Sequence, residues 1–145
     1  KIDYKHFLKE NPTLVKWCTD RKLSIREVGV LIAQRNPGSK ESRLLEGLHR
    51  DDGPLRSKIN FPIHNTKDTW TEWYDVPGLP PFGGPALGLQ DRDLSKLNMI
   101  AEFETVKPVV FNSSIPHRIR IGPNAKVPRI QIAVMFFQNI DYMLE

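Results

Sequence analysis

Apolar side chains recur every three or four residues over the first twenty or so positions, which is the period of an amphipathic helix. Within this stretch, Asn11 is a residue type favoured at helix N-caps, and Pro12 is one favoured in the first helical turn. The pattern therefore predicts two short helices within residues 1–22. We expect their apolar stripes to cover one outer face of a sheet.

The pattern changes after residue 22. Short segments rich in β-branched and aromatic residues alternate with turns of proline, glycine, asparagine and aspartate, at intervals of about 8–12 residues. Such spacing is typical of a sandwich or barrel. It predicts strands at 28–33, 58–63, 70–76, 99–106, 109–113, 118–121 and 129–137, with 58–63 and 70–76 forming a hairpin.

One segment does not fit this pattern. Residues 77–98 are rich in proline and glycine and then in charge, and so long an irregular stretch within a compact domain is usually a functional loop or a disordered one. We predict an irregular loop at 77–98 that could act as a lid. The whole chain, 1–145, is expected to form a single domain, with helices at 1–22 and strands after them.

Composition narrows the function classes. The chain is 39% hydrophobic and 26% charged, and no apolar run reaches the roughly 20 residues that cross a membrane, so membrane insertion is excluded. The net charge of +4 comes without a dense basic block, and nucleic-acid binding is not indicated. A single cysteine, Cys18, favours a reducing, cytoplasmic location. Because the chain starts with lysine, we expect native residues before Lys1.

Four residues carry the candidate chemistry. His49 and Asp51 stand two positions apart and would project from one face of an extended segment. His117 follows Pro116 at a predicted strand start, and Arg129 begins the last predicted strand. Two histidines and one carboxylate form the ligand set that suits non-haem Fe(II), and a buried arginine is a natural partner for a carboxylate. The sequence thus predicts a metal site at His49, Asp51 and His117.

These motifs resemble those of the Fe(II)- and 2-oxoglutarate-dependent oxygenases. The segment with His49-x-Asp51, followed by strands such as Ile59-Asn-Phe-Pro-Ile63 and the aromatic segment 69–74, is similar to small prokaryotic and phage-type members and to the aspartyl/asparaginyl hydroxylase-like group. The likeness covers residues 25–137. It implies a mainly β fold with N-terminal helices, in a double-stranded β-helix (jelly roll, cupin-like).

The resemblance also implies roles. His49, Asp51 and His117 would bind Fe(II), and Arg129 would pair with the distal carboxylate of 2-oxoglutarate. The enzyme would hydroxylate a substrate C–H bond while the cosubstrate is decarboxylated to succinate. Asn60 and Trp73 are further candidates for contact with the cosubstrate. Gln131 departs from the family, in which a serine or threonine often stands at this position.

Several alternatives stay open. Asp52 could replace Asp51 as the carboxylate, and His64 competes as a metal ligand. A jelly roll could also be a catalytically silent binding or structural module, such as one for virion assembly, or a cupin-type metal enzyme that needs no 2-oxoglutarate. The sequence does not identify the substrate, which could be a small molecule or a protein side chain. It leaves self-assembly open as well.

Overall fold

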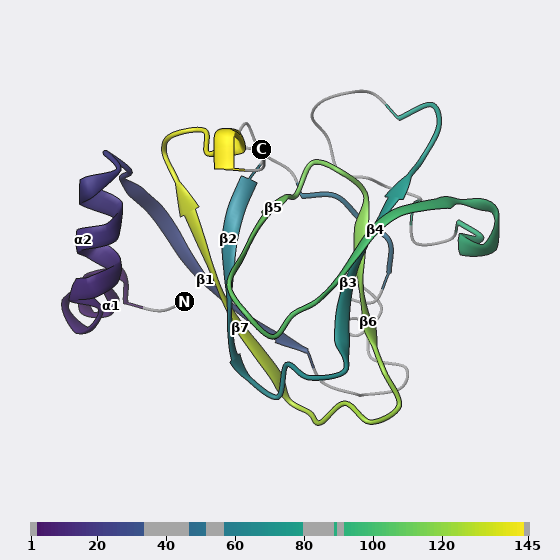
Figure 1. The fold of residues 1–145 in the computed structure, drawn as a ribbon, viewed down its shortest axis with the longest axis horizontal. Helices are drawn as coiled ribbons and strands as arrows, with labels where there is room; N and C mark the ends of the chain where they lie inside the picture. The colour runs from purple at the N-terminus through teal and green to yellow at the C-terminus, as the bar shows by residue number, and fades with distance from the viewer. Residues whose placement is uncertain (1–2, 34–46, 52–56, 80–88, 90–91, 144–145) are drawn as a thin grey trace.

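The computed structural model describes residues 3–33, 47–51, 57–79, 89 and 92–143 (Figure 1). It is mainly β with helices at the N-terminal end, as predicted. The elements are α1 (Tyr4–Glu10), α2 (Pro12–Asp20), β1 (Ile25–Ala33), β2 (Ser57–His64), β3 (Thr69–Asp75), η1 (Leu94–Lys96), β4 (Asn98–Glu104), β5 (Val109–Asn112), β6 (His117–Ile121), β7 (Arg129–Phe136) and η2 (Asp141–Met143).

The two predicted helices are present, and Asn11 and Pro12 separate them. Asp3 caps α1, because its carboxylate accepts from the backbone N–H of Lys5 at 3.0 Å. Asn11 makes no such side-chain bond to α2; its amide instead donates back to the carbonyl of Phe7 at 2.8 Å. The side chain of Asn11 therefore does not cap α2 as expected and is hydrogen-bonded to α1 instead. No helix in the described part of the chain is long and apolar enough to span a membrane.

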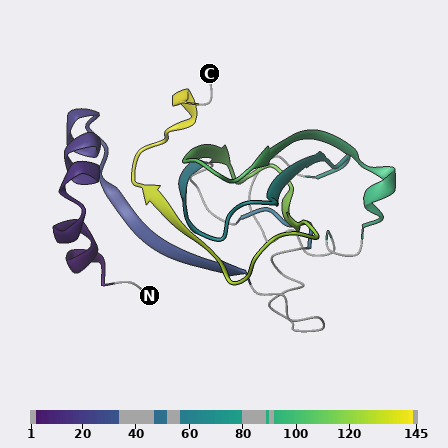
Figure 2. The same cartoon turned by 60° about the horizontal axis from the view of Figure 1, so that its bottom comes forward.

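The strands form two antiparallel sheets. The four-stranded sheet has the order β1-β7-β2-β5 and the three-stranded sheet the order β4-β3-β6. Strands β2 and β3 are consecutive but belong to different sheets, so the predicted hairpin is wrong. The chain turns between them through Asn65 and Asp68, both at positive φ, and crosses from one sheet to the other. Figure 2 shows the helices beside the four-stranded sheet, away from the three-stranded one.

The main hydrophobic core lies between the four-stranded sheet and the helices. Val134 and Phe136 of β7 are almost completely buried there. Burial in this core also raises the pKa of the Cys18 thiol. The buried members of the core are Cys18, Leu23, Ile25, Val28, Ile59, Val134, Phe136 and Ile140.

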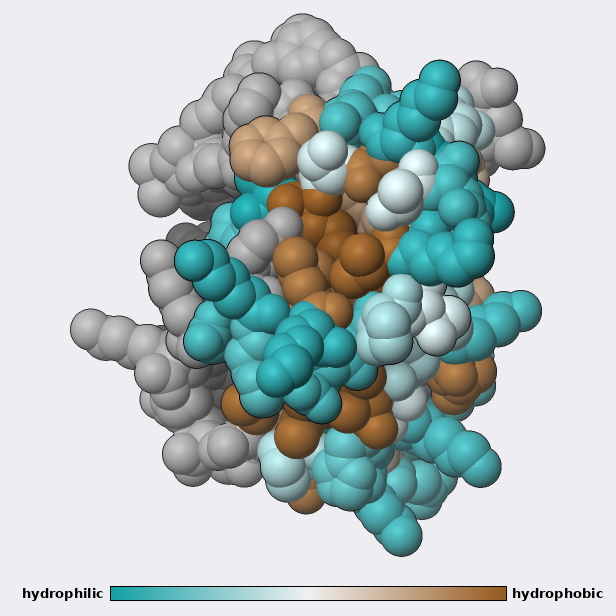
Figure 3. All heavy atoms as spheres, turned by 90° about the vertical axis from the view of Figure 1, so that its left-hand side faces the viewer, coloured by the Kyte–Doolittle hydropathy of each residue, from teal (hydrophilic) through white to brown (hydrophobic). Residues whose placement is uncertain are grey.

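The helix side is not completely covered. Figure 3 views the molecule from this side and shows apolar side chains gathered within a polar surround. A hollow of about 520 Å³ opens against α2, β2 and β5, and its apolar lining includes Trp17, Phe61 and Val110.

Because side chains alternate between the two faces of a strand, the core residues also show which residues of the four-stranded sheet face the other sheet. Ile59 belongs to the core under the helices, so its neighbours Lys58 and Asn60 project toward the other sheet. Arg129 crosses the same space, because its Nε donates to Oγ1 of Thr69 in β3 at 3.1 Å. The space between the sheets is therefore lined by polar and charged side chains as well as by apolar ones.

A second apolar cluster covers the outer face of the three-stranded sheet. Its buried members are Leu48, Tyr74, Val76 and Leu89, with Leu79, Leu94 and Leu97 packed against them. The described part of the predicted loop at 77–98 thus contributes leucines to a small core, and it includes the 3-10 helix η1. Residues 80–88 and 90–91 lie outside the described residues, and the role of the segment as a lid stays a prediction.

Candidate metal centre

The backbones of His49 and His117 form an isolated antiparallel bridge. His49 N–H donates to the carbonyl of His117 at 2.9 Å, and His117 N–H donates to the carbonyl of His49 at 2.7 Å. On its other side His117 pairs with Trp73 of β3. The segment around His49 therefore lies beside β6 and adds to the edge of the three-stranded sheet.

Both imidazoles are oriented by the same local hydrogen bond. Nδ1 of His49 lies 2.9 Å from the carbonyl of Gly47, and Nδ1 of His117 lies 2.8 Å from the carbonyl of Ile115, in each case two residues earlier. A carbonyl only accepts, so each Nδ1 carries a proton, which leaves Nε2 as the nitrogen that can offer a lone pair to a metal. Two Nε2 atoms with lone pairs are what a metal ion requires.

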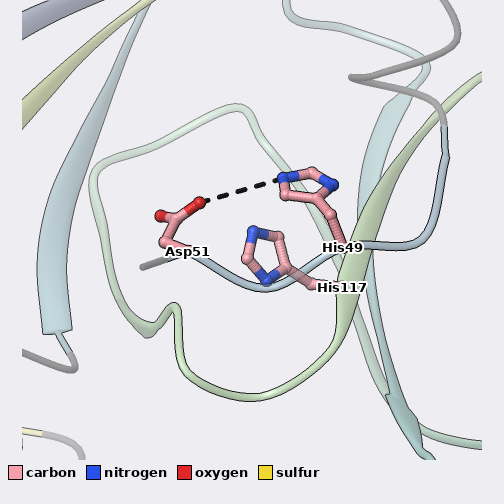
Figure 4. Close-up of side chains that lie close together, drawn as sticks. All are labelled: His49, Asp51 and His117. Atoms are coloured by element: carbon pink, nitrogen blue, oxygen red, sulfur yellow. Dashed lines mark ion pairs between the residues drawn. The ribbon is translucent and has the colours of Figure 1, made fainter. Parts of the chain in front are cut away.

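Asp51 completes the cluster. One ligand atom from each of His49, Asp51 and His117 lies within 4.8 Å of the others, and Oδ1 of Asp51 is 3.9 Å from Nε2 of His49 (Figure 4). The two imidazole rings are 4.5 Å apart between centroids. The structure thus brings together the three residues that the sequence singled out as ligands.

The alternatives for these ligands fare differently. His64 is exposed at the end of β2 and does not belong to the cluster. Asp52 lies outside the described residues. Asp51 is held by its own backbone N–H, which donates to the carbonyl of Ser113 at 2.9 Å, so the segment from His49 to Asp51 is anchored at both ends.

The electrostatics of the cluster come from burial and from one lysine. Burial acts to raise the pKa of Asp51, but Lys58 outweighs it, and the pKa lies below its ordinary value. Lys58 donates from Nζ to Oδ2 of Asp51. Burial, with the nearby His49, lowers the pKa of His117 to about 4. At neutral pH the cluster thus holds an ionised carboxylate and a neutral His117, the forms that bind metals.

Arg129 is a completely buried charged residue. It is 0% exposed, and its guanidinium donates to two hydroxyls, with Nε at 3.1 Å from Oγ1 of Thr69 and Nη2 at 3.4 Å from Oγ1 of Thr105. Nη1 has no hydrogen-bond partner among the described residues. Burial lowers the pKa of this guanidinium to about 10. Among the described residues no carboxylate pairs with this cation, and a buried cation without one is costly, which makes Arg129 a candidate for binding an anion.

Two amides accompany Arg129 on the inner face. Gln131 is the next inward-facing residue of β7, and its Nε2 has no partner among the described residues. Asn60 of β2 is also buried, and within the same part of the chain its Oδ1 has no donor. Trp73 projects from the same face as Thr69 and stands beside His117 in register. All three lie on the inner face, and their contact with a cosubstrate stays a prediction.

Lys58, Thr69 and Thr105 were not foreseen as site residues. Lys58 could have been found from the alternation of Lys58-Ile59-Asn60, because a core position at 59 turns 58 and 60 to the other face. Nothing local indicates the two threonines. Thr105 follows β4 and meets Arg129 only through the packing of the two sheets.

Comparison of the chain with protein-family models, with curated proteins and with solved structures gave no match.

Proposed function

We propose that this chain is an Fe(II)- and 2-oxoglutarate-dependent oxygenase built on a jelly roll. One observation carries the proposal. The His49, Asp51 and His117 cluster occurs with a completely buried arginine, Arg129, whose Nη1 has no partner among the described residues. A metal triad alone suits many reactions, whereas a buried cation between the same two sheets calls for an anionic ligand beside the metal.

The strand order supports a jelly roll. Counting the bridge at His49 as a short strand beside β6, each sheet has four members. Along the chain, successive members alternate between the sheets except at β3 and β4, which pair with each other. Two four-stranded sheets linked in this way are the pattern of a double-stranded β-helix.

The donor set fits a divalent metal. His49 and His117 offer neutral nitrogens and Asp51 offers one anionic oxygen. With Fe(II) bound there, the metal would supply oxygen activation. The chain's own part is to orient these side chains: backbone carbonyls hold both imidazoles, and Lys58 holds the far oxygen of Asp51.

The buried donors fit a dicarboxylate. Nη1 of Arg129 and Nε2 of Gln131 are donors without acceptors among the described residues, and a carboxylate is an acceptor-only group. The unpaired atom of Asn60 is the acceptor Oδ1, which cannot bond to a carboxylate. Asn60 could donate to a carboxylate only if its side-chain amide were rotated by half a turn, so that Oδ1 and the NH₂ group exchanged places. Gln131 would take the place of the small hydroxyl residue that family members often carry.

The spacing of the two ends is also suitable. Thr69, which contacts Arg129, pairs with Ile121, and His117 stands four residues away on the same strand. At about 3.3 Å per residue this separation is about 13 Å along the strand. The side chains of Arg129 and His117, with a metal and a five-carbon dicarboxylate between them, can span this length.

A second candidate is a metal-free jelly-roll module without catalysis. It is favoured by the ion pair of Lys58 with Asp51, because a carboxylate that already has a cation does not need a metal. This candidate offers no anion, among the residues that the structure describes, to pair with the buried Arg129.

Anaerobic titration with Fe(II) and then 2-oxoglutarate tests the proposal. We expect a weak visible charge-transfer band to appear only when both are present. Arg129→Met should bind Fe(II) and fail to form the band at the same 2-oxoglutarate concentration. A folded protein that binds neither component would support the metal-free module.

A further inference from the structure

Lys58 lies where it controls one oxygen of the proposed metal ligand. Its side chain is 12% exposed and projects from β2 into the space between the sheets, where Nζ donates to Oδ2 of Asp51. The other oxygen, Oδ1, is the one that faces His49, 3.9 Å from its Nε2. The two oxygens of Asp51 thus face different partners.

We propose that Lys58 positions Asp51 as a one-oxygen ligand and cancels its charge, so that a metal in this site retains the charge to select a dianionic ligand. The inference rests on the proposed function, which supplies the metal. It assigns a role to a residue outside the ligand set. Lys58 touches neither metal nor cosubstrate in this scheme and is a positioning residue.

The geometric part follows from the hydrogen bond. While Lys58 holds Oδ2, only Oδ1 is available to a metal, and Asp51 cannot bind through both oxygens. One ligand atom from each of the three residues leaves several positions of a six-coordinate ion open. A chelating cosubstrate needs two of them.

The charges around the site favour an anionic ligand. Asp51 and Lys58 cancel, and two neutral imidazoles add nothing, so a divalent ion keeps its full charge of about two units. Arg129 adds another cation between the sheets. A dicarboxylate of two negative charges is the ligand that this excess favours, whereas a neutral ligand leaves it uncompensated.

Lys58 therefore has opposite effects on the two binding steps. It repels the incoming metal ion, which is close enough to feel a buried ammonium strongly. It then strengthens binding of the anion, since it adds positive charge near the metal. A residue that served only to hold the local fold would weaken both steps when removed.

The test measures Co(II) binding and then 2-oxoglutarate binding by calorimetry and by the d–d spectrum of Co(II). The variants are Lys58→Met, which removes the charge, Lys58→Arg, which keeps it, and Lys107→Met, a change at an exposed lysine. We expect Lys58→Met to bind Co(II) more tightly and 2-oxoglutarate about tenfold or more weakly, with an altered d–d spectrum. Lys58→Arg and Lys107→Met should resemble the parent in both steps.

The outcomes separate this inference from the proposed function. If the parent binds no Co(II) but Lys58→Met does, Lys58 keeps the metal out of the site, and both the oxygenase proposal and this inference fail. If Lys58→Met binds Co(II) no better than the parent while circular dichroism shows it folded, the inference is wrong, whatever the parent does. Should Lys58→Met not fold, Lys58→Arg decides, because loss of metal binding in that charge-retaining variant would also overturn the inference.

Discussion

His49 and His117 exchange two backbone hydrogen bonds, at 2.9 and 2.7 Å, although they come from distant parts of the chain. Directly paired residues of an antiparallel ladder project from the same face, so this bridge by itself brings the two imidazoles together. Each ring is then held by a carbonyl two residues earlier. The candidate ligand geometry is thus fixed by main-chain contacts, and ligand substitutions can be made without removing what holds the segments in place.

The first prediction concerns His49→Ala. It removes one proposed ligand and leaves the bridge, so Co(II) affinity should fall by roughly a hundredfold or more, while the free energy of unfolding changes by about 1 kcal/mol or less. Calorimetric titration with Co(II) and urea unfolding measure the two effects. His64→Ala is the matched control, since His64 is exposed and outside the cluster. Equal affinities in the two variants would mean that the site is wrongly assigned.

A second prediction follows from the burial of His117. Burial, with nearby His49, lowers its pKa to about 4 in the folded protein, from an ordinary value of 6.5. Below pH 6.5 the unfolded chain gains a proton that the folded chain does not, so stability falls with pH until about pH 4 and then levels off. This loss should reach up to about 3 kcal/mol in the metal-free protein.

His117→Gln isolates this effect. Glutamine has no titrating ring, so the variant should lack the loss between pH 6.5 and 4. Urea unfolding of both proteins across this range, with a chelator present, gives the difference directly. The prediction fails if the two stability curves run parallel, because the loss would then belong to other groups.

The third prediction is that Arg129→Met raises the stability of the ligand-free protein and removes its binding of 2-oxoglutarate. The guanidinium is completely buried, and its folded pKa of about 10 means that the cost of holding the charge is present in full at neutral pH. Methionine should stabilise the ligand-free protein by about 1 to 3 kcal/mol. It should also abolish stabilisation by 2-oxoglutarate in thermal unfolding of the metal-loaded protein. A variant that is less stable and still responds to 2-oxoglutarate would contradict both parts.

Much of the secondary structure could be predicted from local patterns. The alternation that marks β2 and β3, and the break at Asn11 and Pro12, depend on neighbouring residues and appear directly in the sequence. The pairing of strands does not. β2 and β3 look like a hairpin because a polar turn joins two apolar segments, yet the turn carries the chain from one sheet to the other.

The sequence singled out the three residues that the structure brings together, but not the residues that support them. His49, Asp51 and His117 stand out because few residue types bind metals, and chemistry limits how they combine. Thr69 and Thr105 are ordinary residues whose contact with Arg129 exists only after two sheets have packed. Such contacts join distant segments, so no local pattern encodes them.

The last prediction lies outside the candidate site. Glu72 projects from the outer face of the three-stranded sheet and is 3% exposed. Its carboxylate accepts from Nε of Arg118 at 2.7 Å, from the hydroxyl of Tyr74 at 2.7 Å and from Nε of Arg120. Burial acts to raise the pKa of Glu72, but these hydrogen bonds outweigh it and the pKa lies below its ordinary value.

Glu72→Gln keeps the shape of this side chain and removes its charge, leaving two arginines without their shared carboxylate. We expect a loss of about 2 to 4 kcal/mol in the free energy of unfolding near neutral pH, since breaking a buried charge network is costly. The contribution of Glu72 is complete above the ordinary carboxyl pKa and disappears as pH falls through the lower folded value, so the difference from the parent should shrink at acid pH.

Glu102→Gln, which removes only an exposed contact to Arg120, should cost much less. Co(II) affinity should be the same in both variants as in the parent, because the Glu72 network and the candidate metal centre lie on opposite faces of β3 and β6; a parallel loss of metal binding would show that the two faces are coupled.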